Sequence, residues 1–203
     1  MGSIPEKDGG IIVKAARLAI ESMMSKEDTA ENKLRMMLSS IVFNAKEGVF
    51  VSLYHHHTNE LRGCIGFPEH SKEIRYKIVN AARAAAFEDK RFVPISKNEL
   101  DETIVEVNLL SESKQLPETA KGRKDAIKIG RDGLIVEYGI RRGLLLPSVA
   151  TENGMNKEEF LEAVCKKAGL NKNYWKQKNV HIRKFETQIF KEESPNGKVA
   201  EVT

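Results

Sequence analysis

The stretch that decides the fold is GVFVSLYHHHTNELRGCIG, residues 48–66. Its first part alternates like a strand and is rich in β-branched and aromatic side chains, HHHTNE forms a polar connection, and LRGCIG resumes the strand pattern. These features predict a hairpin of two strands with a longer loop. Because successive side chains of a strand point to opposite faces, we expect Arg62, Cys64 and Gly66 to share the face that the apolar side chains avoid.

The segments around this hairpin mix helices with further strands. Helical spacing of apolar residues and alternation of the strand type predict helices at 11–24, 73–87 and 157–168, and strands at 103–110, 133–139, 141–147 and 180–190. Asn156 and Glu159 have the spacing of a capping box at the start of the last helix. Strands come in pairs between helices, which is typical of an α+β protein with a mostly antiparallel sheet flanked by helices.

Length and composition describe an ordinary globular chain. The 203 residues suit one domain, or one domain with a modest second lobe, and 40% of them are apolar. The polar, glycine-containing ends, 1–10 and 194–203, are expected to be flexible tails. Between them we find no repeat and no low-complexity linker.

Charge and cysteine content indicate the cell compartment, the source and the partners that the protein is expected to have. Lys and Arg exceed Asp and Glu by four, without the basic stripe of a duplex-binding protein, and a charged fraction of 31% suggests surface ion pairs and a thermophilic source. Two cysteines make no disulfide framework and no secretory leader opens the chain, so we expect a reducing cytoplasm. No apolar run reaches the roughly 20 residues of a membrane span, and no membrane association is expected.

Cys64 is the candidate for chemistry. Arg62 lies about 7 Å along the strand and could favour the thiolate. Gly63 and Gly66 add no bulk, so a ligand or another backbone segment could come close. Cys64 is a small buried hydrophobe, a cysteine that contacts a ligand, or a nucleophile, and all three interpretations stay open. Cys165, on the apolar stripe of a helix, is expected in the core.

Glu106 and Asn108 share one face of the strand at 103–110. If that face meets the face of Arg62 and Cys64, a cation, a thiol, a carboxylate and an amide share one site, with Glu106 as a proton carrier. Alternatively the face is exposed to solvent, where Glu and Asn are common. The register of the strands decides between the two.

Other motifs favour structural roles. Of His55, His56 and His57 at most the first and third converge, and they lack a partner at metal-ligand spacing, so no metal site is predicted. GRDG, residues 130–133, is predicted to be a turn, and the chain holds no nucleotide or hydrolase motif, so no cofactor is expected. Asp89 either braces a local turn with Arg91 or lines the same site as LRGCIG.

The hexapeptide also carries a family resemblance. LRGCIG, followed by AAFEDKRF, IVEVNLL, IGRDGLIVEYG, LLLPSVA and EEFLEAVCKKAGL in that order, resembles the AMMECR domain family over residues 12–193. The resemblance implies a single α+β domain of two lobes, the larger and the smaller, with the hexapeptide near a cleft between them. Two positions depart from the family pattern: Lys90 stands where proline is common, and Met155 where tryptophan is common.

The family's biochemical activity is not established, so three functions are weighed. The first is an enzyme or enzyme accessory that holds a small anionic ligand with Arg62 and uses Cys64 and Glu106. The second is a regulatory module that binds nucleic acid or protein through a basic cluster, which comprises Arg141, Arg142, Lys172, Lys176, Lys178 and Arg183 with Tyr174 and Trp175. The third is a scaffold for a radical SAM or Memo-type partner, to which the family resemblance links prokaryotic members.

Overall fold

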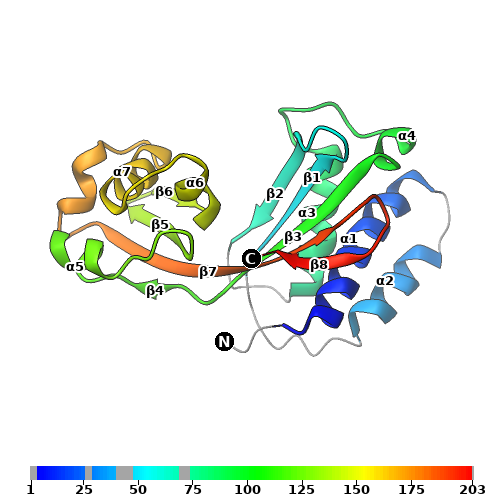
Figure 1. Ribbon diagram of the computed structural model, residues 1–203, viewed down its shortest axis with the longest axis horizontal. Helices are drawn as coiled ribbons and strands as arrows, with labels where there is room; N and C mark the ends of the chain where they lie inside the picture. Colours follow the sequence, from blue (N-terminus) through cyan, green and yellow to red (C-terminus); the bar gives the residue numbers. More distant parts are fainter. Residues whose placement is uncertain (1–3, 26–28, 40–47, 69–73, 203) are drawn as a thin grey trace. The chain divides into compact units, whose positions relative to one another are not determined.

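The computed structural model of the chain is shown in Figure 1, and it describes residues 4–25, 29–39, 48–68 and 74–202. It confirms the predicted α+β class with antiparallel strands flanked by helices. The chain forms two compact units: a larger unit of Met1–Leu110 with Gln188–Thr203, and a smaller unit of Ser111–Thr187. The cleft implied by the family resemblance stays a prediction.

The sheet of the larger unit is built around the predicted hairpin. Strand β1 pairs antiparallel with β2 on one side and with β3 on the other, and β2 ends the strand order. The next strand after β3 is β7, with which β8 pairs antiparallel. The bounds are β1 Gly48–His55, β2 Leu61–Phe67, β3 Thr103–Leu110, β7 His181–Glu192 and β8 Val199–Val202.

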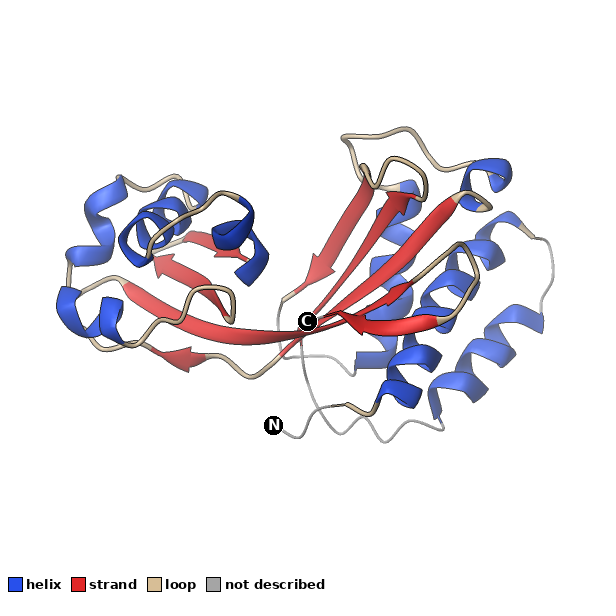
Figure 2. Ribbon diagram, viewed as in Figure 1, coloured by secondary structure: helices blue, strands red, loops and turns tan. Residues whose placement is uncertain are grey.

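Helices cover one face of this sheet (Figure 2). Helices α1 (Glu6–Met24) and α3 (Ile74–Phe87) pack against the strands, α2 (Thr29–Ser39) packs against α1, and the short α4 (Lys97–Leu100) contacts β3. Alternate strand residues point toward α1 and α3 and form the core with them, among them Val49, Val51, Leu53, Val105 and Val107. Each buried side chain of this size stabilises the fold by roughly 1.5–3 kcal/mol. The residues between them on each strand therefore face the other way.

The smaller unit has its own strands and core. Its strands are β4 (Lys114–Gln115), β5 (Asp132–Tyr138), β6 (Arg141–Leu145) and the first part of β7, and its helices are α5 (Ala120–Asp125), α6 (Pro147–Glu152), α7 (Lys157–Lys167) and the 3-10 helix η1 (Lys172–Lys176). The predicted capping box is confirmed, since Asn156 and Glu159 exchange hydrogen bonds at the start of α7. Cys165 is fully buried in this core, as expected.

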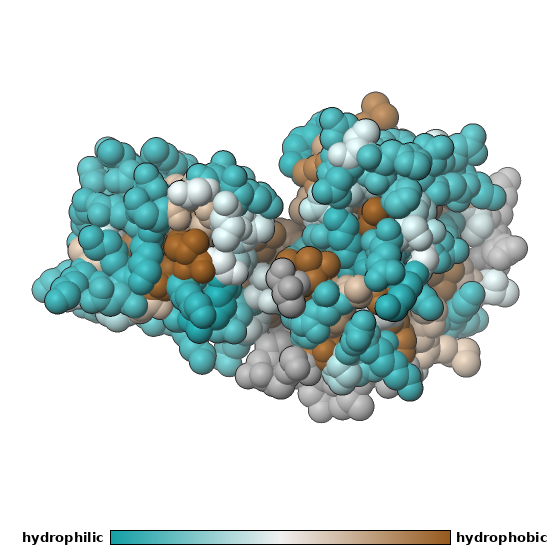
Figure 3. Space-filling model, viewed as in Figure 1, coloured by the Kyte–Doolittle hydropathy of each residue, from teal (hydrophilic) through white to brown (hydrophobic). Residues whose placement is uncertain are grey.

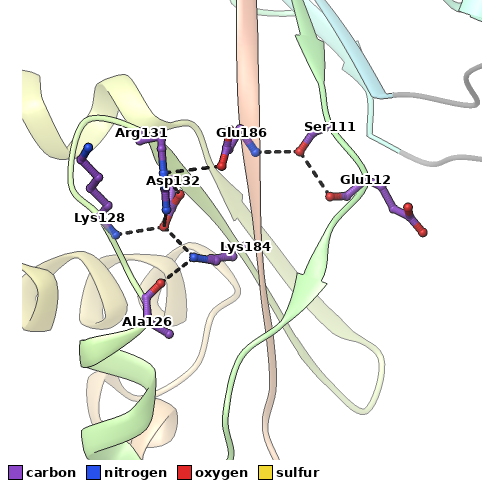
Figure 4. A network of polar contacts seen from close by, with 8 residues as sticks. All are labelled: Ser111, Glu112, Ala126, Lys128, Arg131, Asp132, Lys184 and Glu186. Carbon is purple, nitrogen blue, oxygen red and sulfur yellow. Dashed lines mark hydrogen bonds and ion pairs between the residues drawn. The ribbon is translucent and has the colours of Figure 1, made fainter. Parts of the chain in front are cut away.

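The GRDG segment is a turn only in its first half, because Asp132 and Gly133 already begin β5, and the buried carboxylate of Asp132 braces it (Figure 4). Asp132 is fully buried and accepts hydrogen bonds from the Lys128 backbone N–H (2.9 Å), Arg131 Nε (2.7 Å) and Lys184 Nζ (3.1 Å). Burial alone would raise the pKa of Asp132, but these hydrogen bonds outweigh it and lower the pKa below its ordinary value. The segment is therefore a structural brace.

Regular structure extends into both segments that we predicted to be tails. Helix α1 begins at Glu6, and β8 adds a strand beside β7. Composition alone missed these because both elements depend on contacts with distant parts of the larger unit. On the face drawn in Figure 3 both units are mainly hydrophilic, with small apolar patches. Within the described residues, no helix combines the length and hydropathy that a membrane crossing requires.

Candidate functional site

The strand register brings three polar side chains into one row on the larger unit. Ser52 of β1 is paired with Cys64 of β2 on one side and with Glu106 of β3 on the other. Directly paired residues point to the same face of a sheet. Cys64, Ser52 and Glu106 therefore lie side by side on the face opposite α3, and Asn108, two residues beyond Glu106, shares it. We call this surface, defined by these four residues, the polar face.

Two hydrogen bonds and one ion pair organise the polar face. Ser52 Oγ donates a hydrogen bond to Cys64 Sγ (3.3 Å), and Asn108 Nδ2 donates one to Glu106 Oε1 (2.8 Å). Lys191 of β7 places Nζ 3.9 Å from Glu106 Oε2, which adds a cation to the row. A thiol, a hydroxyl, a carboxylate and an ammonium group thus follow one another across the sheet.

Arg62 does not join this row, because β2 contains a bulge. Leu53 is paired with Gly63 whereas Tyr54 is paired with Leu61, so Arg62 is an extra residue without a partner on β1. The bulge shifts the alternation by one residue, and Leu61 takes the place on the polar face that we assigned to Arg62. The predicted alternation was therefore wrong at this position. A repeating pattern cannot reveal an inserted residue.

The buried guanidinium of Arg62 is committed to an ion pair with the partly exposed Glu99. The side chain is buried, with Arg62 only 4% exposed, and its Nε and Nη2 donate to the Glu99 carboxylate. Nη2 also donates to the Val93 carbonyl (2.7 Å), and the guanidinium lies 5.5 Å from the centre of the Phe92 ring. Arg62 therefore joins β2 to the segment that leads into α4.

Asp89 and Arg91, rather than Arg62, are the charged residues that contact Cys64. Because β2 ends the order of the described strands, its outward N–H and C=O groups face no strand of that set. Asp89 Oδ2 accepts from the Cys64 backbone N–H (2.9 Å), and Arg91 Nη2 donates to Asp89 Oδ2 (2.7 Å) and to the Cys64 carbonyl (3.4 Å). Asp89 thus braces the turn with Arg91 and also contacts the hexapeptide.

The electrostatics around Cys64 favour the neutral thiol. Burial raises its pKa most, the hydrogen bond from Ser52 and the charge of Arg91 lower it, and the charge of Glu106 raises it again; the net effect is a raised pKa. The hydrogen bonds from Arg91 and from the Cys64 N–H hold the pKa of Asp89 well below its usual range, against its burial. The cation that acts on the thiol is therefore Arg91.

Both glycines of the hexapeptide are surrounded by protein atoms. A β-carbon at Gly63 would overlap the Ala85 carbonyl of α3, and one at Gly66 would overlap the Phe50 ring. Of the two possibilities that we considered at Gly63, close approach of another backbone segment is the one in the structure. The alanine stripe of α3 makes this approach possible.

Comparison with known proteins identifies the family of this chain. The model of the AMMECR1 family matches residues 13–190, which is most of the chain. The chain belongs to the AMMECR1 family. Among its relatives, Protein MJ0810 of Methanocaldococcus jannaschii is 41% identical over 96% of this chain and 95% of its own length. Protein Ta0236 of Thermoplasma acidophilum is 42% identical over 92% of this chain and 88% of its own length.

A solved structure supports the whole-chain match. The crystal structure of the uncharacterized protein PH0010 from Pyrococcus horikoshii has a TM-score of 0.83 and 36% identity, and the match covers 98% of each chain. The relatives named here are archaeal proteins. Of the two departures from the AMMECR1 pattern, Lys90 is an exposed turn residue, and Met155 packs against the core of the smaller unit.

Sequence reasoning missed Ser52, Lys191 and Arg91 at or beside the polar face. Ser52 had a signal, since it is the one small polar side chain among the apolar and aromatic residues of GVFVSLY, residues 48–54. Arg91 was named only as a turn residue, and Lys191 gave no signal because its place beside Glu106 depends on strands far apart in the chain. No group of three or more metal-ligating side chains occurs in the described part of the chain.

The basic cluster weighed for nucleic-acid binding lies in the smaller unit and is lined with carboxylates. Trp175 is 1% exposed and belongs to the core, and Tyr174 packs edge-on against Tyr138. The ion pairs are Arg142–Glu137 (3.2 Å), Arg183–Glu137 (2.8 Å), Lys172–Glu162 (3.7 Å) and Lys176–Glu158 (3.1 Å). These contacts give no specific support to a nucleic-acid interface.

Proposed function

We propose that the polar face is the functional site of this AMMECR1-family protein, and that it binds and acts on a small anionic molecule. The observation that carries the proposal is the row of Cys64, Ser52 and Glu106, fixed by direct pairing on three adjacent strands. Side chains held on strands keep their relative positions better than side chains on loops, as a reaction requires.

The residues have distinct roles in this proposal. Glu106, between Asn108 and Lys191, accepts a proton from the substrate, and Cys64 contacts the substrate as a neutral thiol. Arg91, whose side chain is 57% exposed, holds the anionic group in place of the buried Arg62. Arg62, Gly63 and Gly66 act indirectly, by shaping the strand that carries Cys64.

The compartment, source and partners of the protein belong to the same proposal. From composition we place the protein in a reducing cytoplasm and infer a thermophilic source, and its archaeal relatives favour an archaeon. Association with a radical SAM or Memo-type protein stays a prediction from the family resemblance, and nucleic-acid binding stays a prediction from the basic cluster.

Two alkylating reagents test the proposal directly. Iodoacetate carries a carboxylate and iodoacetamide does not, so a face that attracts small anions will direct iodoacetate to Cys64. We follow alkylation of Cys64 by mass spectrometry and take the ratio of the iodoacetate to the iodoacetamide rate constant. We expect this ratio to exceed that of a free thiol in solution by about fivefold, a factor that corresponds to the energy of a typical exposed ion pair. The raised pKa of Cys64 affects both rates equally and cancels in the ratio.

Two matched variants test whether Arg91 causes the higher ratio at Cys64. Arg91→Gln is expected to return the ratio to that of a free thiol, while Lys90→Gln, which removes a neighbouring exposed cation, leaves it unchanged. A ratio in the wild-type protein at or below that of a free thiol would show that the polar face does not attract small anions, and the proposal would fail.

A further inference from the structure

A concave site lies in the larger unit, in a groove between α2 and α3. Its volume is about 430 Å³, within the roughly 300–1,000 Å³ of small-molecule sites. Helix α1 packs against both helices, and all three belong to the helical layer in Figure 1. Since α3 covers the face of the sheet opposite Cys64, this groove is separate from the polar face.

The inner wall of the groove is apolar. Leu34 and Leu38 of α2 line it together with Val79 of α3. The two leucines are part of the larger unit's core, and Val79 packs against that core. A hydrocarbon or aromatic body placed here would contact a wall that already has packed atoms behind it.

The rim of the groove is basic. Arg35, Arg75 and Arg83 line it, and the only acidic residue among its described lining residues is Glu31. Glu31 pairs with Arg83, whose Nη2 also donates to Ser22 Oγ of α1 (3.0 Å) and so is fixed in position. Charge at the rim is therefore complementary to an anion, and arginine suits carboxylate, sulfonate and phosphate groups alike.

An aromatic side chain borders the same rim. The Arg75 guanidinium lies 5.4 Å from the centre of the Tyr76 ring, and Tyr76 is 58% exposed. Exposed tyrosine beside arginine offers a flat surface on which an aromatic ligand can stack. An apolar wall, an aromatic rim and an excess of arginine occur here together.

We propose that the groove between α2 and α3 binds a small amphipathic anion. The apolar body lies against Leu34, Leu38 and Val79, and the anionic group lies at the arginines of the rim. The size of the groove favours a single small molecule over a protein segment. This site does not depend on the function proposed for the polar face.

The test uses 8-anilinonaphthalene-1-sulfonate, an aromatic sulfonate whose fluorescence rises in an apolar site. We expect one molecule to bind the folded protein, and Arg35→Glu to weaken its binding about tenfold, because the change removes one attraction and adds one repulsion. Lys33→Glu is the matched control, since Lys33 is an exposed cation of the same helix outside the lining and its replacement alters the net charge equally.

A neutral relative of the probe, N-phenyl-1-naphthylamine, tests the anionic requirement. It should bind more weakly than the sulfonate and respond equally to the two variants. Binding of the sulfonate that is absent, or that weakens equally in Arg35→Glu and Lys33→Glu, would overturn the proposal. Equal affinity for the neutral relative would do the same.

Discussion

Single residues of the hexapeptide show how packing fixes sequence. At Gly63, a β-carbon would overlap the Ala85 carbonyl. This carbonyl belongs to the backbone of α3, so moving it would disturb the helix. We expect Gly63→Ala to lower the free energy of unfolding by about 2–3 kcal/mol, the usual cost of overpacking. Urea denaturation measures this change.

Gly10 offers the matched control. It lies within α1, and a β-carbon there would meet nothing within 4 Å. Gly10→Ala should therefore stabilise the protein by up to about 1 kcal/mol through helix propensity. If Gly63→Ala is as harmless as Gly10→Ala, α3 does not approach β2 as closely as described.

Asp89 gives stability a defined pH dependence. Its folded-state pKa lies below the unfolded value of roughly 3.9, so the carboxylate stabilises the fold fully above that value, and this stabilisation is lost as the pH falls through the folded-state pKa. We expect Asp89→Asn to cost about 2 kcal/mol at neutral pH, as for a hydrogen-bonded charge. The difference from wild type should shrink below a pH of about 4.

Urea denaturation from neutral to acidic pH follows this difference. Arg91→Gln should flatten it, because the hydrogen bond from Arg91 is the largest cause of the lowered pKa of Asp89. A difference that stays constant with pH would show that Asp89 is not held as the carboxylate.

At the scale of elements, the Arg62–Glu99 ion pair ties β2 to α4. Arg62 is buried and Glu99 is 28% exposed, so removing Glu99 leaves a buried guanidinium unpaired. We therefore expect Glu99→Ala to cost about 3 kcal/mol, and Arg62→Ala, which leaves the partly exposed carboxylate, to cost less. The double variant with Glu99→Ala should cost clearly less than the sum of the two single variants, as measured by denaturation. Additive costs would mean that the pair does not couple the two elements.

The elements also show what sequence could and could not predict. The hairpin and the capping box of α7 follow from residues adjacent in the chain, and both were predicted. The bulge at Arg62 was not, because it is stabilised by Glu99, 37 positions away, and by a carbonyl in a loop. The row on the polar face depended on register, which a single strand pattern leaves open.

At the scale of the whole molecule, the two units have separate cores, and the single tryptophan reports on one of them. Trp175 lies in the core of the smaller unit. We expect Leu161→Ala, in that core, to lower the denaturation midpoint seen by tryptophan fluorescence, with a cost of about 2–5 kcal/mol. Leu53→Ala, in the core of the larger unit, should lower the midpoint seen by circular dichroism and leave the fluorescence midpoint nearly unchanged. Equal shifts of both signals in both variants would indicate one cooperative unit.

Composition described the molecule correctly only in general terms. Apolar content and strand order were enough to predict an α+β protein. The ends were misjudged because even a short segment can form an element when a distant partner exists, as Val199–Val202 does beside β7. The identity of the cation beside Cys64 required the packed structure.

The measurement that tests the central claim most directly is the pH dependence of iodoacetamide alkylation at Cys64, in the wild-type protein and in Glu106→Gln. If Cys64 and Glu106 share the polar face, the wild-type midpoint lies above the roughly 8.5 of a free thiol, and Glu106→Gln lowers it because a charge that raises the pKa is removed. Cys165, whose pKa burial raises to about 11, serves as the internal control. A midpoint at or below that of a free thiol, unchanged by Glu106→Gln, would contradict the account.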